Sequence, residues 1–322
     1  LASKKEFHEE FKEGLQETMS NTVTYKELSS IPVLMDEYRN AVKDVIPGIG
    51  EKRSAKENPK TAYEVKGVTV DIAHLAAYTS ATGLRLGNEL PLTYPYVLSF
   101  PLVMKVLTAS DSPLNAMGLV HLNNKIEQKR PLTVEDTFDI RVHADNLRPQ
   151  NKGVLLDLIT EVSVDDDVVW TQTSAFLAKG AKLSSSSPYK DKPAEDGRLL
   201  GTAEATEGTP TSTIRVTPED IKVYAEASGD KNPIHVSNLG AKAFGFPGTI
   251  AHGMWSTAAA LRALEGLIPD AVRYEIDFAK PVVLPASVAL FSSQDANGTW
   301  ELQLRKASKL ETLHANAKLE EL

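Results

Sequence analysis

The chain has 322 residues, a length that favours about two domains, and 42% of its residues are hydrophobic, enough for ordinary globular cores. Its 35 basic and 43 acidic residues leave a net charge of −8, which argues against broad electrostatic binding to nucleic acid. The sequence contains no cysteine, so a disulfide scaffold, a thiol nucleophile and a thiolate metal site are excluded.

No apolar run approaches the ~20 residues that a bilayer-crossing helix needs, so we expect no membrane span. The chain starts with a charged, polar stretch rather than with a signal sequence. These features lead us to expect a cytoplasmic enzyme that acts on small or carrier-borne substrates.

The first 60 residues are charged, and their apolar residues recur at helical spacing. We expect flanking helices here, not a domain. The apolar positions are Phe7, Phe11 and Leu15, followed by Leu34, Met35, Tyr38, Ala41, Val42 and Val45.

Two parts of the chain form a degenerate repeat. Residues 70–83 align with residues 216–229 at a constant offset of 146, and Val, Tyr, Ala and Gly recur at matching positions. Each copy continues into segments typical of strands, the first set alternating apolar with polar residues. We therefore expect helices followed by an antiparallel sheet in each copy, an α+β plan. The predicted strands are 138–144, 154–164 and 168–177 in the first copy, and 288–293, 300–306 and 312–319 in the second.

The repeat suggests a division of the chain into four parts. We expect an N-terminal helical extension over 1–60, a first module over 61–180, a linker over 181–213 and a second module over 214–322. The linker is rich in Ser, Pro, Gly, Thr and charged residues, and such a composition buries too little apolar surface to order itself. In the second module, Thr217 before Pro218 marks a helix start, and a longer apolar helix is predicted from Gly253 to about Gly266.

The second module carries the residues with chemical potential. Asp230 and His235 lie five residues apart around an Asn232-Pro233 turn, so a carboxylate and an imidazole can converge on one small volume. Further on, His252-Gly253 opens the apolar helix, whose first N–H groups could receive a developing negative charge. A base and an oxyanion site are the minimum for adding water to a polarised double bond.

Residues 224–235, with Phe246-Pro247, His252-Gly253-Met254 and residues 274–282, resemble the signature of the MaoC-like (R)-specific enoyl-thioester hydratases and 3-hydroxyacyl-thioester dehydratases. A two-module form of the family is also similar to the first half, so the resemblance covers residues 60–320. It implies a tandem double hot-dog fold, in which a sheet wraps a long helix in each module. It also implies reversible dehydration of (3R)-hydroxyacyl thioesters to trans-2-enoyl thioesters, carried on coenzyme A or on acyl carrier protein.

The resemblance also implies residue roles. Asp230 and His235 would position and deprotonate a water, and the Gly253 N–H would stabilise the enolate-like oxygen. From the residues themselves, we expect Asn232 to brace the turn, because its amide has no useful acid or base character, and His252 to orient the loop. The Asp230–His235 pair would return a proton to C2, so no metal or redox cofactor is expected. The seven histidines also include no pair at metal-binding helical spacing, which argues against a zinc site.

The first module is expected to have lost the site. The offset places Leu84, Leu86 and Glu89 where Asp230, Asn232 and His235 stand in the second module. It can still supply a wall of an acyl pocket. We expect the substrate-binding residues to be Tyr94, Tyr96, Leu98 and Leu102, with Phe100 and Met104 as further lining, together with Phe246 of the second module.

Two other functions stay open at this point. One is a hot-dog thioesterase, which would hydrolyse the same substrates, and the other is a non-catalytic acyl-thioester-binding protein. The intact Asp-Asn-Pro-His run argues against both. The sequence leaves open the carrier, the acyl length, and whether the protein is a monomeric pseudo-dimer or a homodimer.

Overall fold

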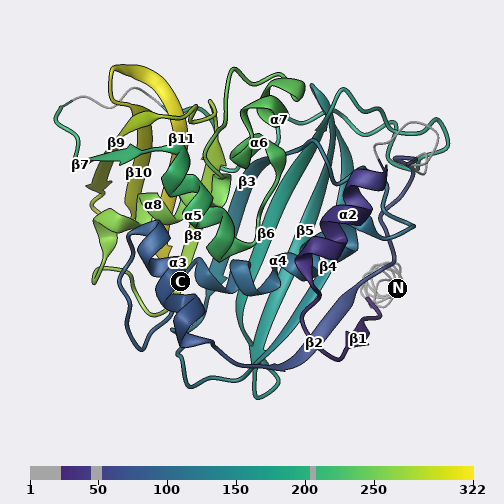
Figure 1. Cartoon of the computed structure of the whole chain (residues 1–322), viewed down its shortest axis with the longest axis horizontal. Coiled ribbons are helices and arrows are strands. Elements are labelled where there is room, and N and C mark those ends of the chain that lie inside the picture. Colours follow the sequence, from purple (N-terminus) through teal and green to yellow (C-terminus); the bar gives the residue numbers. More distant parts are fainter. Residues whose placement is uncertain (1–22, 45–52, 204–207) are drawn as a thin grey trace, which may run out of the picture.

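The computed structural model describes residues 23–44, 53–203 and 208–322. Its strands form one sheet of 11 strands, in the order β1-β2-β4-β5-β6-β3-β8-β11-β10-β9-β7 (Figure 1). The strands are β1 Lys26–Leu28, β2 Tyr63–Val68, β3 Leu119–Gln128, β4 Phe138–Gln150, β5 Gly153–Val164, β6 Asp167–Lys179, β7 Ser212–Val216, β8 Val272–Phe278, β9 Ala286–Gln294, β10 Trp300–Lys306 and β11 Lys309–Glu321.

Figure 1 shows the helices α3, α4 and α5 lying across the sheet. Two short helices, α6 and α7, follow the Asn232-Pro233 turn. The described helices are α2 Leu34–Asp44, α3 Ile72–Thr82, α4 Tyr94–Thr108, α5 Pro218–Ser228, α6 Pro233–Val236, α7 Asn238–Ala243 and α8 Gly253–Leu261, followed by the 3₁₀ turn η1 Arg262–Leu264. None of these helices has the length and hydrophobicity needed to cross a membrane.

The sheet consists of two similar halves. Strands β2, β4, β5, β6 and β3 make the first half, and β7, β9, β10, β11 and β8 make the second. Antiparallel pairing of β3 with β8, for example Asn124 with Ile276, joins them at the centre. The predicted strand segments all lie inside observed strands. The α+β class and the tandem double hot-dog fold expected from the sequence are confirmed; the module boundaries stay a prediction.

Helices α3 and α5 carry the repeat most clearly, because both begin and end at the offset of 146 residues. Asp71 caps the start of α3, and Thr217 caps α5 in a capping box with Asp220. Each helix ends at a glycine in the left-handed region, Gly83 with φ 70° and Gly229 with φ 74°. The two helices therefore have matching starts and matching ends.

Helices α4 and α8 are the central helices of the two halves. Every residue of α8 after Gly253 is buried, from Met254 to Leu261. Most of its residues are apolar, as expected for a helix that protein covers on all sides. α8 ends at Leu261 and passes into η1, which accounts for the longer helix predicted from the sequence.

The predicted linker is held by the rest of the protein rather than by a core of its own. The N–H groups of Leu199 and Leu200 donate to the two carboxylate oxygens of Asp277, at 2.9 and 2.8 Å. Gly197 accepts from the Asn123 side chain at 2.5 Å. This part of the chain therefore lies along β3 and β8, where the two halves meet.

The N-terminal extension contributes α2, which confirms the helical spacing from Leu34 onward, while Phe7, Phe11, Leu15 and Val45 lie outside the described residues. Glu37 of α2 is buried and bonds two residues of α4, Lys105 at 3.0 Å and Thr108 at 2.8 Å. Helix α2 thus packs on α4, beside the turn at Asn232-Pro233.

Candidate active site

The turn after α5 holds Asp230 in place. Gly229 takes a positive φ to end the helix, and a Cβ there would lie only 2.5 Å from the Leu34 side chain of α2. Asn232 then caps α6 by accepting from the Ile234 N–H at 3.3 Å, and Pro233 starts that helix. The Asn-Pro pair therefore converts a helix end directly into a helix start, with Asp230 on one side and His235 on the other.

One oxygen of the Asp230 carboxylate is fully engaged. Its Oδ1 accepts from the Tyr38 hydroxyl at 2.5 Å and from the Asn232 N–H at 3.2 Å. The side chain is 19% exposed, and its Oδ2 lies 3.9 Å from His252 Nε2. Asp230 thus keeps its second oxygen for the pocket.

His235 is fixed in one tautomer by its backbone partner. Its Nδ1 lies 2.8 Å from the carbonyl oxygen of Ile250, and a carbonyl can only accept, so Nδ1 carries the proton. The neutral ring therefore has an unprotonated Nε2. Burial lowers the pKa of His235 below its ordinary value, which keeps the ring neutral near pH 7.

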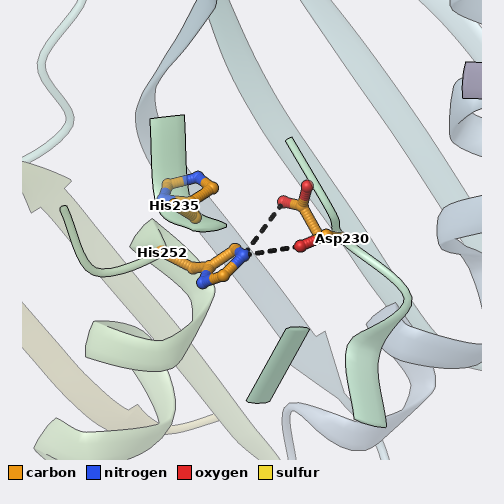
Figure 2. A group of neighbouring side chains, drawn as sticks. All are labelled: Asp230, His235 and His252. Atoms are coloured by element: carbon orange, nitrogen blue, oxygen red, sulfur yellow. Dashed lines mark hydrogen bonds and ion pairs between the residues drawn. The ribbon is translucent and has the colours of Figure 1, made fainter. Parts of the chain in front are cut away.

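His252 lies face to face with His235, with ring centroids 3.7 Å apart and planes inclined at 26° (Figure 2). Its Nε2 donates to the backbone oxygen of Asp230 at 2.8 Å. Burial lowers the pKa of His252 to about 3, so this ring is neutral as well. His252 therefore links the start of α8 to the turn that carries Asp230.

Competing influences set the charge of Asp230. Burial by itself would raise the pKa of its carboxyl group, but His252, His235 and the hydrogen bonds from Tyr38 and Asn232 outweigh it, so the pKa lies below its ordinary value. Near pH 7 the site therefore contains an ionised carboxylate beside neutral imidazoles. This pairing is suited to taking a proton and returning it.

Gly253 is the first residue of α8, and the N–H groups at such a start have no partner within the helix. A Cβ at Gly253 would lie 3.1 Å from the Phe278 ring and 3.5 Å from His121 Nδ1. The absence of a side chain thus keeps backbone, Phe278 and His121 in close contact. Both Gly253 and His121 line the pocket that contains Asp230.

Asp230, His235 and His252 also have donor atoms within 4.8 Å of one another, a set that could be considered for a metal ion. The rings of His235 and His252, however, are stacked, whereas the ligands of one ion point their lone pairs at a common centre. In addition, His235 Nδ1 and His252 Nε2 each donate a hydrogen bond to a backbone carbonyl. The arrangement fits proton transfer better than metal binding.

The pocket extends from this polar cluster into the first half of the molecule. The second half lines it with Asp230, Asn232, His235, Phe246, His252, Gly253, Lys280 and His314, among others. The first half and α2 contribute Tyr38, Tyr96, Phe100, Met104, Leu107, Ala116, Met117, Leu119, His121 and Phe176. One end of the pocket is therefore polar and the other almost wholly apolar.

Three buried histidine nitrogens on the pocket wall lack a hydrogen-bond partner among the described residues. They are His121 Nε2, His252 Nδ1 and His314 Nε2. A buried polar atom without a partner costs roughly 1–3 kcal/mol, so such atoms gathered at one pocket indicate a ligand that satisfies them.

Most of the site residues predicted from the sequence line one pocket, and some lie outside it. Of the residues predicted to bind substrate, Tyr96 and Phe246 line the pocket, whereas Tyr94, Leu98 and Leu102 do not. The lining expected from the sequence consists of every second residue of 94–104, a spacing that suits a strand. In α4 each residue turns 100° from the last, so positions 96, 100, 104 and 107 share the face toward the pocket. The expected lining is corrected to that face.

Tyr94 has a different contact. Its hydroxyl is hydrogen-bonded to His74 Nδ1 at 2.8 Å, and His74 Nε2 donates to the Ala227 carbonyl at 2.8 Å. Since a carbonyl only accepts, His74 Nε2 carries a proton. Tyr94 therefore supports the last turn of α5, just before Asp230, from the first half of the molecule.

The sequence pattern does not indicate two of the residues at the site, Tyr38 and His121. Tyr38 belongs to a stripe of apolar residues at helical spacing, and this pattern does not indicate a partner 192 positions away. His121 lies in β3 at a register shift, where a bulge redirects side chains. A single histidine in a segment that alternates apolar and polar residues does not indicate that its side chain faces the site.

A family model described as the MaoC like domain matches residues 202–313. The chain is 44% identical, over 251 residues, to 3-hydroxyacyl-thioester dehydratase X of Mycobacterium tuberculosis, covering 78% of this chain and 86% of that protein. Over 152 residues it is 29% identical to the peroxisomal enoyl-CoA hydratase 2 of Arabidopsis thaliana, covering 45% of this chain and 48% of that one.

Among solved structures, the crystal structure of HtdX of Mycobacterium tuberculosis superimposes with a TM-score of 0.70 at 41% identity, covering 81% of this chain and 100% of that chain. The agreement thus extends over both halves of the sheet, beyond the residues that the family model matches. On this evidence, the chain belongs to the MaoC-like family of hydratases and dehydratases.

Proposed function

We propose that the protein catalyses the reversible dehydration of (3R)-hydroxyacyl thioesters to trans-2-enoyl thioesters. The observation that carries this proposal is the convergence of Asp230, His235 and the start of α8 on one pocket. An ionised carboxylate, an imidazole with a free nitrogen and unpaired backbone N–H groups are the groups that adding water to an unsaturated thioester needs. Membership of the family supports the same reaction.

In the hydration direction, Asp230 Oδ2 and His235 Nε2 hold one water between them. As its oxygen bonds to C3, the pair takes a proton from the water, and the electrons of the double bond move onto the thioester oxygen. The Gly253 N–H stabilises that oxygen, a contact of a kind worth ~3 kcal/mol when one donor is removed. The pair then returns a proton to C2, so one water is added and no electrons leave the substrate.

This scheme needs no metal or redox cofactor, because the proton taken from water is the one returned to carbon. Dehydration follows the same steps in reverse. The division of acid and base work belongs to the Asp230–His235 pair as a whole, since two coupled groups titrate together.

The acyl tail is proposed to lie along the apolar end of the pocket, against Phe100, Met104 and Leu107 of α4. The thioester then sits at Gly253, and the carrier arm leaves past Phe246 and Lys280. Each methylene buried in this way contributes ~0.8 kcal/mol. Coenzyme A and acyl carrier protein present the same arm, so either fits this placement.

The unpartnered histidine nitrogens are consistent with this substrate. Burial holds His121 and His252 neutral, so each ring offers a donor or an acceptor without carrying charge. A thioester and its arm carry carbonyl, hydroxyl and amide groups that can pair with such atoms.

We further propose a cytoplasmic enzyme whose two halves act together as a pseudo-dimer within one chain.

The full chain, incubated with crotonyl-CoA, tests the proposal. Loss of the enoyl absorbance with no release of free thiol is the expected result, and the product should be the (3R)-hydroxy thioester. Release of free thiol would instead identify a thioesterase. Saturable binding of the substrate without either change would identify a non-catalytic binding protein. Both of these outcomes contradict the proposal.

A further inference from the structure

Tyr38 contacts the reacting end of the site from outside the region that the family model matches. Its hydroxyl lies 2.5 Å from Asp230 Oδ1, across 192 residues of sequence. The ring is 8% exposed and lines the same pocket as His235 and Gly253. The contact therefore joins the N-terminal extension to the carboxylate.

The direction of this hydrogen bond follows from charge. Burial, together with the neighbouring Asp230 carboxylate, raises the pKa of Tyr38, so the phenol stays protonated and donates. A hydrogen bond to an ionised acceptor is shorter and stronger than one between neutral groups. With the Asn232 N–H as second donor, Oδ1 is saturated and the carboxylate has one orientation, with Oδ2 left for the water.

We propose that Tyr38 is a positioning residue for the reaction: α2 places its hydroxyl on Asp230 Oδ1, which fixes the carboxylate and directs Oδ2 to the water. This inference rests on the proposed role of Asp230. It makes the N-terminal extension part of the active site rather than a flanking segment.

The attachment of α2 to the molecule does not depend on this bond. Glu37 pairs with Lys105 and Thr108 of α4, and Leu34 fills the space beside Gly229. Tyr38 is thus presented by a helix that is already held on both sides. A purely structural hydroxyl would be expected to bind α4, whereas this one is bonded to a carboxylate in the pocket.

The test compares three variants of the full chain with the wild type in crotonyl-CoA hydration, measuring kcat and KM across pH. Tyr38→Phe keeps the ring and removes only the hydroxyl. Tyr25→Phe is the matched control, because its hydroxyl belongs to the same extension and bonds His143 at 2.8 Å, not Asp230. Asp230→Asn is measured in parallel, and thermal unfolding verifies that each variant is folded.

For Tyr38→Phe we expect kcat to fall by about 10- to 100-fold, the range that the loss of one hydrogen bond to a charged group gives, with KM little changed. The acid limb of the pH profile should move to higher pH, because a bond that stabilises the ionised carboxylate is gone. Tyr25→Phe should match the wild type.

An unchanged pH profile in folded Tyr38→Phe, beside an inactive Asp230→Asn, overturns the role of Tyr38 alone. A rise in kcat does so too, since it would mean that α2 obstructs the pocket. Full activity in Asp230→Asn would overturn the proposed mechanism itself, and with it this inference.

Discussion

Asp230 and His235 face the same pocket, the first as an ionised carboxylate and the second as a neutral ring. Hydrogen bonds and nearby imidazoles keep the carboxylate ionised despite burial, while burial keeps the His235 ring neutral. Both groups are moreover oriented by the backbone, Asp230 by the Asn232 N–H and His235 by the Ile250 carbonyl. Each is therefore ready to act in its functional protonation state near neutral pH.

Replacing either group should remove most of the activity. Asp230→Asn and His235→Ala are each expected to lower kcat by a factor on the order of 10² to 10⁴, as is typical of general acid–base groups. The measurement is crotonyl-CoA hydration by purified variants whose fold is verified by circular dichroism. Glu89→Ala is the matched control, because Glu89 stands at the position of His235 in the first half and is exposed. Comparable losses in all three variants would contradict the assignment of catalysis to the second half.

Helix α4 determines the shape of the apolar end of the pocket. Its pocket face consists of Tyr96, Phe100, Met104 and Leu107, one residue for each turn of the helix. Leu98 and Leu102 point to other parts of the structure and do not line the pocket. Substrate length is thus expected to depend on a single stripe of this helix.

Met104→Trp should shorten the space available to the acyl tail. We expect activity on long acyl thioesters to fall much more than activity on crotonyl-CoA, because each methylene that no longer fits forfeits ~0.8 kcal/mol of burial. Profiles of kcat/KM against chain length check this, with Leu98→Trp as the control from outside the pocket face. Parallel profiles in the Met104 variant and the wild type would place the tail elsewhere.

The two halves of the molecule share one site although only one half carries the motif. β3 and β8 join the halves into one sheet, and His121 of β3 lies against Gly253 and stacks on Phe176, with ring centroids 4.5 Å apart. His74 likewise ties α3 to the end of α5. The degenerate half therefore supports the catalytic turn as well as lining the pocket.

Buried neutral histidines should make the whole fold sensitive to acid. Burial lowers the pKa of His121 to about 4 and that of His252 to about 3, against about 6.5 in the unfolded chain. Below pH 6.5 the unfolded state binds more protons, so each such group costs ~1.4 kcal/mol of stability per pH unit until its folded pKa is reached. We expect the unfolding midpoint to fall between pH 7 and pH 5.

Thermal unfolding of the wild type and of His121→Phe at both pH values measures this effect. The variant should lose less stability on acidification, because it lacks one group that gains a proton on unfolding, and the new ring can stack on Phe176 as the imidazole does. Equal losses in both proteins would mean that His121 is not held neutral in the fold.

The sequence by itself determined the local features of this protein. Caps and the Asn-Pro turn act within a few residues, so the start of α5, the turn that carries Asp230 and the start of α8 could be predicted. The offset of 146 residues indicated two similar halves, and alternation placed the strands. The family resemblance supplied the chemistry of Asp230, His235 and Gly253.

Only the tertiary structure decided which distant side chains meet these groups. The contact of Tyr38 with Asp230 spans 192 residues, and that of His121 with Gly253 depends on the pairing of the two halves. The pocket face of α4 likewise required its helical geometry, since Leu102 and Met104 are both apolar in the sequence but only Met104 lines the pocket. Local sequence rules act over one or two turns of chain, whereas packing brings together residues that the sequence leaves unrelated.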